Sequence, residues 1–184
     1  MQGWAQAAQG HAEEGLAQLL QGWAAYQATG AALFRSYFLS LLAETYGHGR
    51  QPEAGLRVLT EALAAEHTSG EHFYTAELYR LRGELLLQSG AWAPESSVSP
   101  PLSAVWNPHA AEAEDCFHQA LALARQQQAK ALELRAATSL SRLWQQQGKR
   151  AEARQLLAEV YCWFTEGFDT VDLQEAKALL DALS

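Results

Sequence analysis

Hydrophobic residues recur with a helical period along most of the chain. From residue 110 to 164 a helical hairpin is written twice, because segments 111–121 and 151–161 align without a gap. The spacing of apolar residues at i, i+3, i+4 and i+7 marks further amphipathic helices before this stretch. No segment alternates with the period of two that marks a half-buried strand. The pattern therefore predicts an all-α protein.

Helix start and stop signals place the predicted elements. Gly30 supplies the left-handed residue that ends a helix, and Pro52 sits at a first turn, where a missing N–H costs nothing. The helical pattern stops after Gly90, because four of the five prolines lie between residues 91 and 109. Besides the helices of the double hairpin, we predict helices at residues 2–9, 11–28, 31–48, 52–69, 71–89 and 171–183.

Small residues mark a repeat. Gly15, Gly55, Ala113 and Ala153 occupy the same place in their helices, where two helices touch closely, and lie 40, 58 and 40 residues apart. The longer step contains the proline-rich stretch 91–109, which we interpret as an insertion into a repeat of about 40 residues. A pair of helices cannot bury its apolar face alone, so the copies stack. We expect a right-handed α-solenoid of stacked antiparallel helix pairs.

The whole chain, residues 1–184, then forms one repeat domain with a helical cap at its C-terminus. Its 184 residues, 48% of them hydrophobic, are enough to bury a sizeable core. We predict a partial repeat, three full repeats of which the second carries the insertion, and a capping helix, at residues 1–29, 30–69, 70–126, 127–168 and 171–183.

Each repeat combines a first-helix motif, a turn glycine and a second-helix motif. These motifs stand at Leu42, Ala43, Tyr46, Gly83, Leu86, Ser141 and Trp144, at Gly10, Gly90 and Gly148, and at Ala113, Phe117 and Ala120. They resemble the tetratricopeptide-repeat (TPR) superfamily. The resemblance covers nearly the whole chain, although the repeat is longer than the usual one of about 34 residues. Arg50 departs from it by standing where the pattern has a turn glycine.

Residues 145–180 are similar to a narrower group. They resemble the C-terminal long-repeat region of large bacterial signal-transduction ATPases, the adenylate-cyclase-linked or LuxR-like regulators. The resemblance implies a non-catalytic protein–protein interaction and scaffold module, the sensor or partner-binding arm of such a protein. A small-molecule effector-binding sensor domain is the alternative. Because Met1 begins in the middle of a helical pattern, we expect a piece of a longer protein. No Walker motif or cyclase domain occurs, so we expect the catalytic activity of the parent to be absent from this piece.

Charge and cysteine usage narrow the classes of partner. A formal net charge of −8 argues against nucleic acid, because phosphate binding needs clustered Lys and Arg. No stretch approaches the roughly 20 apolar residues of a membrane span. Cys116 and Cys162 stand far apart and form no zinc or disulfide motif, so we interpret both as small buried residues of a cytoplasmic protein.

Catalytic and metal-binding patterns are missing from the sequence. The six histidines form no H-E-x-x-H motif and no i, i+4 pair, and no Ser or Thr has triad partners at a helical offset. Glu13, Glu14, Glu112 and Glu114 lie in first turns, where carboxylates complement the helix dipole. We therefore expect no catalytic residues, no metal and no cofactor.

The TPR resemblance implies that the first helix of each repeat lines a concave groove. Three arginines would face this groove, and a guanidinium grips a carboxylate in a bidentate way, so we expect a protein or peptide partner with an acidic group. We also expect these arginines to be exposed and dispensable for folding. Alternatively, they pair with Glu44, Glu77 and Glu84 on neighbouring helices and bind nothing. The predicted partner-binding residues are Tyr37, Glu44, His48, Arg80, Glu84, Arg135, Arg142 and Gln145.

The two ends of the solenoid differ in polarity. A solenoid needs a polar cap at each end, and helix 171–183 has the composition of one. The N-terminal half-helix 2–9 does not, so we expect Trp4, Leu16 and Leu20 to be partly exposed. We predict self-association through that uncapped end.

Overall fold

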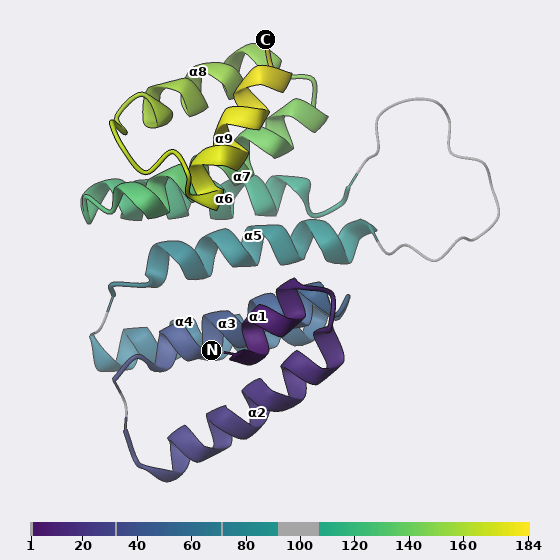
Figure 1. Ribbon diagram of the computed structural model, residues 1–184, viewed down its shortest axis with the longest axis vertical. Helices are drawn as coiled ribbons and strands as arrows, with labels where there is room; N and C mark the ends of the chain where they lie inside the picture. The colour runs from purple at the N-terminus through teal and green to yellow at the C-terminus, as the bar shows by residue number, and fades with distance from the viewer. Residues whose placement is uncertain (1, 32, 71, 92–106) are drawn as a thin grey trace, which may run out of the picture.

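The computed structural model describes residues 2–31, 33–70, 72–91 and 107–184, and these residues form helices and connecting turns without any strand. Figure 1 shows their order along the chain. The predicted all-α class is therefore confirmed. The helices are α1 (Gln2–Ala8), α2 (Ala12–Ala28), α3 (Arg35–His48), α4 (Pro52–Ser69), α5 (Thr75–Ala91), α6 (Ala110–Gln126), α7 (Lys130–Gln146), α8 (Arg150–Tyr161) and α9 (Val171–Ala182).

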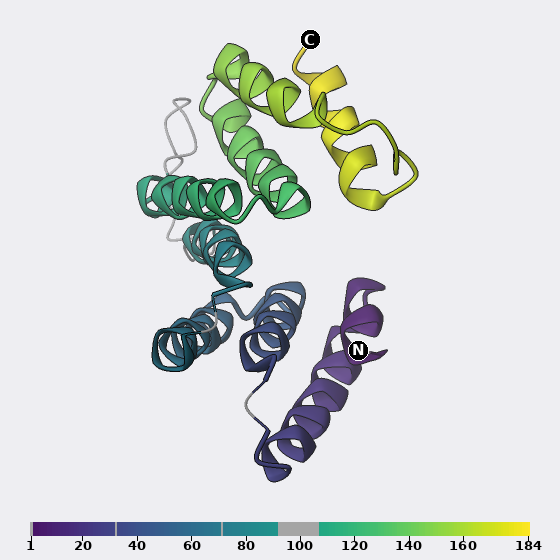
Figure 2. The same cartoon turned by 90° about the vertical axis from the view of Figure 1, so that its left-hand side faces the viewer.

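The helices stack in consecutive antiparallel pairs. Within the pairs, α1 packs on α2, α3 on α4, α5 on α6 and α7 on α8. The first helices also contact each other in sequence, so that α1, α3, α5, α7 and α9 form one continuous layer. Seen from the side, the stack is an arc whose two ends, α1 and α9, lie on the same side (Figure 2). This arrangement is the predicted α-solenoid, and the layer of first helices is its inner wall.

The small residues that mark the repeat lie where helices touch. A Cβ atom on Gly15 would stand 2.3 Å from the Gly3 carbonyl oxygen, and one on Gly55 would stand 2.7 Å from a Leu85 methyl carbon. Ala113 and Ala153 are fully buried. The two glycines therefore lack room for a Cβ atom, and the two alanines lie inside the packed helix contacts.

Two hydrophobic clusters hold the stack together. One is centred on Leu39, Leu59 and Leu78 of α3, α4 and α5. The other spans α6 to α9 around Phe117 and Leu140, and Leu86 of α5 belongs to it. Truncating a buried residue of this size to alanine costs about 2–5 kcal/mol. Because α5 contributes to both clusters, it ties the two halves of the solenoid together.

Helix α3 starts four residues later than predicted. Phe34 adopts φ 62°, in the left-handed region, so the helix cannot extend back through it. Leu33 and Phe34 have the spacing of core residues within the predicted helix 31–48, which favours burial, but they are 57% and 49% exposed. Phe73 is likewise 44% exposed and packs edge-on against the Phe34 ring instead of entering the core.

Two of the three predicted turn glycines lie in turns, whereas Gly90 lies inside α5, which extends to Ala91. Gly10 and Gly148 have positive φ at the turns that follow α1 and α7. Arg50, which stands in place of the turn glycine, takes the same conformation with φ 55°. Arg50 has a Cβ atom and is therefore strained at positive φ, whereas glycine is not.

The predicted insertion, residues 91–109, lies mostly outside the described residues. Helix α5 ends at Ala91 and α6 begins at Ala110, so the boundaries agree within a residue. At the far end, the Asn107 side-chain amide donates a hydrogen bond of 2.8 Å to the Leu87 carbonyl oxygen. Within the described chain, no helix is long and apolar enough to cross a membrane.

One prediction about the cysteines was wrong. Cys116 is buried in α6, as expected, but Cys162 is exposed. Cys162 stands directly after the last residue of α8, where the helix has ended and its apolar face no longer packs.

Candidate functional site

A cleft of about 720 Å³ opens on the inner wall of the arc. It draws residues from all five first-layer helices, including the two at the ends of the solenoid. A smaller cavity of about 190 Å³ shares several of its walls and adds Tyr37, Ser40, Leu41, Tyr74 and Glu77. The cleft is lined by Trp4, Ala8, Glu44, His48, Arg80, Glu84, Arg135, Thr138, Ser139, Arg142, Val171, Asp172 and Glu175.

Most of the predicted groove residues meet in this cleft. Tyr37 lines the adjoining cavity instead, and Gln145, half-buried on α7, lines neither. The residues brought together are Glu44, His48, Arg80, Glu84, Arg135 and Arg142. Their part in binding stays a prediction, but their common location follows from the helical repeat.

Arg80 is the buried centre of the polar network. Its Nε and Nη2 donate to the two carboxylate oxygens of Glu77 at 2.9 and 2.7 Å, and its Nη1 donates to Glu84 at 2.5 Å. The spacings i, i+3 and i, i+4 on α5 make these contacts possible. Burial lowers the pKa of Arg80, but Glu77 and Glu84 raise it more, so the guanidinium stays charged.

The expectation that Arg80 is exposed was wrong. The residue is only 5% exposed, and Glu77 beneath it is 2% exposed. Both side chains lie within the layer of first helices, where α5 packs against α3 and α7. Arg80 therefore belongs to the folded core as much as to the cleft.

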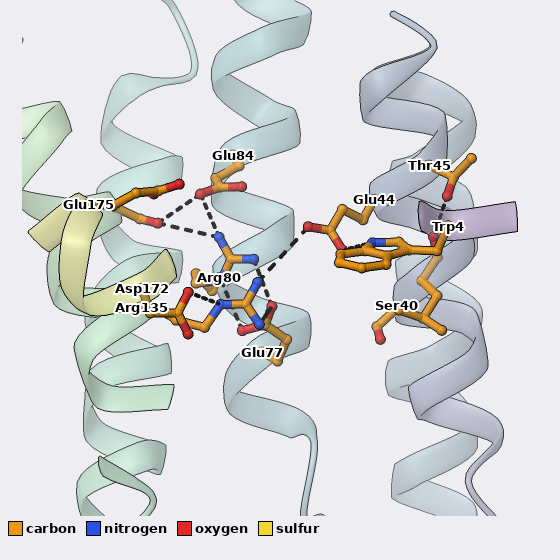
Figure 3. A network of polar contacts seen from close by, with 12 residues as sticks. Trp4, Ser40, Glu44, Thr45, Glu77, Arg80, Glu84, Arg135, Asp172 and Glu175 are labelled. Atoms are coloured by element: carbon orange, nitrogen blue, oxygen red, sulfur yellow. Dashed lines mark hydrogen bonds and ion pairs between the residues drawn. The ribbon is translucent and has the colours of Figure 1, made fainter. Parts of the chain in front are cut away.

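Arg135 links three helices across the cleft (Figure 3). Its Nη1 lies 2.9 Å from Glu77 of α5. Its other nitrogens lie 4.0 Å from Glu44 of α3 and 3.9 Å from Asp172 of α9. Arg135 thus connects the central repeats with the capping helix.

Arg142 pairs at the rim. Its Nη2 donates to Glu175 of α9 at 2.6 Å, and both side chains are nearly half exposed. All three arginines are therefore paired, as the alternative interpretation held. Glu44, Glu77 and Glu84 are partners of Arg80 and Arg135, as that interpretation named them. Arg80, however, pairs with Glu77 and Glu84 on its own helix and not on a neighbouring one, and the pairing of Arg142 with Glu175 was not predicted.

Trp4 closes the N-terminal end of the cleft. Its indole Nε1 donates a hydrogen bond of 2.6 Å to Glu44 (Figure 3). Helix α1 reaches this position because the backbones of Gly3 and Gly15 pack closely. Sequence reasoning missed Trp4 as a cleft residue and treated it only as part of an open end, where it is indeed partly exposed.

The floor of the smaller cavity is aromatic. Tyr37 and Tyr74 pack edge-to-face with 5.2 Å between ring centroids. Burial, together with the Glu77 carboxylate, raises the pKa of Tyr74 to about 12. This phenol therefore stays neutral at physiological pH and acts as a polar but uncharged wall.

The cleft combines charged and apolar groups. Its arginines pair with carboxylates, and its apolar walls are the Trp4 ring, Ala8 and Val171. Among the residues that the structure describes, no group of His, Cys, Asp and Glu is placed to hold a metal ion.

The similarity of this chain to known proteins lies in its fold. No family model matches the sequence, and no curated protein matches it significantly. Two crystal structures of a kinesin light chain-like protein with nearly identical TPR-like repeats from Podosopora anserina share its architecture. One of them, the structure of a point variant, has a TM-score of 0.65 at 16% identity, and the other has 0.63 at 18%. In both, the match covers 98% of this chain and 81% of the other. The chain thus has the fold of TPR-like repeat proteins.

Proposed function

We propose that the protein is a protein- or peptide-binding scaffold and that the cleft on its inner wall is the binding site. The observation that carries this proposal is the makeup of the cleft, which takes side chains from each of α1, α3, α5, α7 and α9. Stacked repeats use such extended concave surfaces to bind partners. The fold shared with TPR-like repeat proteins supports the same role.

Further, we propose that this scaffold is the partner-binding or sensor arm of a larger bacterial signalling ATPase and works in the cytoplasm. The resemblance of residues 145–180 supports this context. The gene's full length tests it, since a nucleotide-binding domain on the same chain is the expected finding.

A small-molecule effector site is the second candidate. The cleft volume of about 720 Å³ lies within the range of ligand pockets, about 300–1,000 Å³. Such pockets are mostly apolar, however, and charged side chains make up more than half of this lining. The lining therefore favours the peptide over the small molecule.

Site-specific photo-crosslinking tests the proposed site. Val171 is 66% exposed and lines the cleft, whereas Trp163 is 58% exposed and lies outside it. A photo-crosslinking amino acid at position 171 should capture peptides selected on the protein by display, and the same group at position 163 should not. Equal capture at both positions, or capture at 163 alone, would overturn the proposal.

A further inference from the structure

The cleft has more carboxylates than guanidiniums. Arg80, Arg135 and Arg142 line it together with four carboxylates, and the Glu77 carboxylate lies beneath Arg80 and Arg135. With His48 neutral, the formal balance is two negative charges. A negatively charged partner would therefore enter a site that already has an excess of its own sign.

Each arginine is paired with at least one carboxylate, and three carboxylates keep an oxygen atom that an incoming group can reach. Glu84 accepts from Arg80 and from Ser139 through Oε1, and Glu175 accepts from Arg142 through Oε2. The second oxygen of each takes no hydrogen bond from the described residues. Asp172 lies 3.9 Å from its nearest guanidinium nitrogen, beyond hydrogen-bonding distance. These side chains are 33%, 49% and 47% exposed, so a group that enters the cleft can reach them.

Binding an anion in the cleft costs more free energy than binding a cation. An anion meets guanidiniums that are each already paired with a carboxylate, and Arg80 is nearly inaccessible. A cation finds carboxylate oxygens that already lack a partner. The net charge of −8 adds long-range attraction for a basic partner.

Apolar groups stand at both ends of the same cleft. Trp4 and Ala8 line it from α1, and Val171 lines it from α9. Lys and Arg side chains lay their aliphatic stems on such surfaces while the charged head remains polar. An indole face also attracts a cation.

We propose that the cleft takes a basic peptide. A Lys or Arg side chain of this peptide meets Glu84, Asp172 and Glu175, and an apolar side chain packs beside Trp4 or Val171. The inference rests on the proposed function and names the chemistry of its partner. It replaces the acidic group that the sequence predicted for the partner with a basic one.

Fluorescence anisotropy with three labelled peptides tests the charge. Each peptide has the same length and the same leucines, and its remaining positions are Lys, Glu or Gln. The wild type should bind the Lys peptide about tenfold more tightly than the Gln peptide, and the Glu peptide least tightly. This preference should weaken as salt is raised, because exposed charges are screened.

A matched pair of variants locates the effect. Asp172→Asn with Glu175→Gln removes two carboxylates from the cleft, and Glu152→Gln with Glu166→Gln removes two exposed carboxylates outside it. The first double variant should weaken Lys-peptide binding about fivefold or more and strengthen Glu-peptide binding. The second should change the Kd less than twofold.

The contrary outcomes distinguish a failure of the basic-partner inference from a failure of the proposed function. Tighter binding of the Glu peptide by the wild type overturns the basic-partner inference and leaves the proposed function standing. Equal binding of all three peptides, or an equal effect of the two double variants, also overturns the inference. Failure of every peptide, combined with no specific crosslink at position 171, overturns the proposed function itself.

Discussion

At the residue scale, the cleft depends on one buried carboxylate. Glu77 bonds Arg80 on its own helix and contacts Arg135 on α7. The spacing of Glu77, Arg80 and Glu84 is visible in the sequence, but pairing was expected between neighbouring helices and not within α5. The burial of Arg80 was not, because it depends on how closely α7 packs beside α5.

Arg80 should matter for folding, and Arg142 should not. Arg80→Ala leaves Glu77 buried with one partner fewer, which should cost toward the lower end of about 3–5 kcal/mol, since Arg135 remains. Arg142→Ala removes an exposed pair worth about 0–1 kcal/mol. Urea unfolding of both variants measures the difference. Equal stabilities would contradict the buried network.

Glu133 should make stability depend on pH. Burial raises the pKa of this carboxyl, but hydrogen bonds from Lys130 and Arg125 lower it more, so its folded pKa is below the unfolded value of about 4.3. Its stabilising contribution is present above that value and is lost as pH falls through the folded pKa. Glu133→Gln should therefore flatten the fall in unfolding free energy below about pH 4.3. An unchanged acid profile would contradict this role.

At the scale of elements, packing overrides helix propensity at Gly83. A Cβ atom there would stand 2.5 Å from Cε1 of the fully buried Phe117 ring. The sequence indicated a small residue at this position from the repeat motif. The sequence did not show which aromatic ring packs against Gly83, because the insertion separates α5 from α6.

Two glycine substitutions test this packing. Gly83→Ala should destabilise the protein, although alanine is the better helix former, because the Phe117 ring must move. Gly22 lies in α2 with nothing within 4 Å of an added Cβ, so Gly22→Ala should stabilise by about 0.5–1 kcal/mol. Thermal unfolding of the two variants should show shifts of opposite sign. A stabilising effect of both would contradict the close contact.

At the scale of the whole molecule, the curvature of the stack builds the cleft. The pattern of apolar positions predicted the helices and the solenoid. It did not predict that α1 and α9 supply cleft walls, because the curvature is a sum of small rotations between repeats. Trp4, Val171, Asp172 and Glu175 were for this reason missed, although all four are prominent cleft residues.

The N-terminal end should support self-association. Leu20 is 41% exposed on α2, the outer helix of that end, and Leu16 is half-buried. We predict that light scattering shows a mass that rises with concentration and that Leu20→Glu abolishes the rise. Gln18→Glu is the control, since Gln18 is already polar and exposed on the same helix. A wild-type monomer at high concentration would contradict the prediction.

The central claim is that a partner peptide binds in the cleft, and the Trp4 indole reports on it directly. Trp4 Nε1–H donates to Glu44 inside the cleft, whereas the Trp163 ring is exposed outside it. In an NMR titration with a displayed peptide, the indole N–H signal of Trp4, assigned by Trp4→Phe, should shift, and that of Trp163 should stay. A shift of Trp163 with an unchanged Trp4 signal would contradict the account.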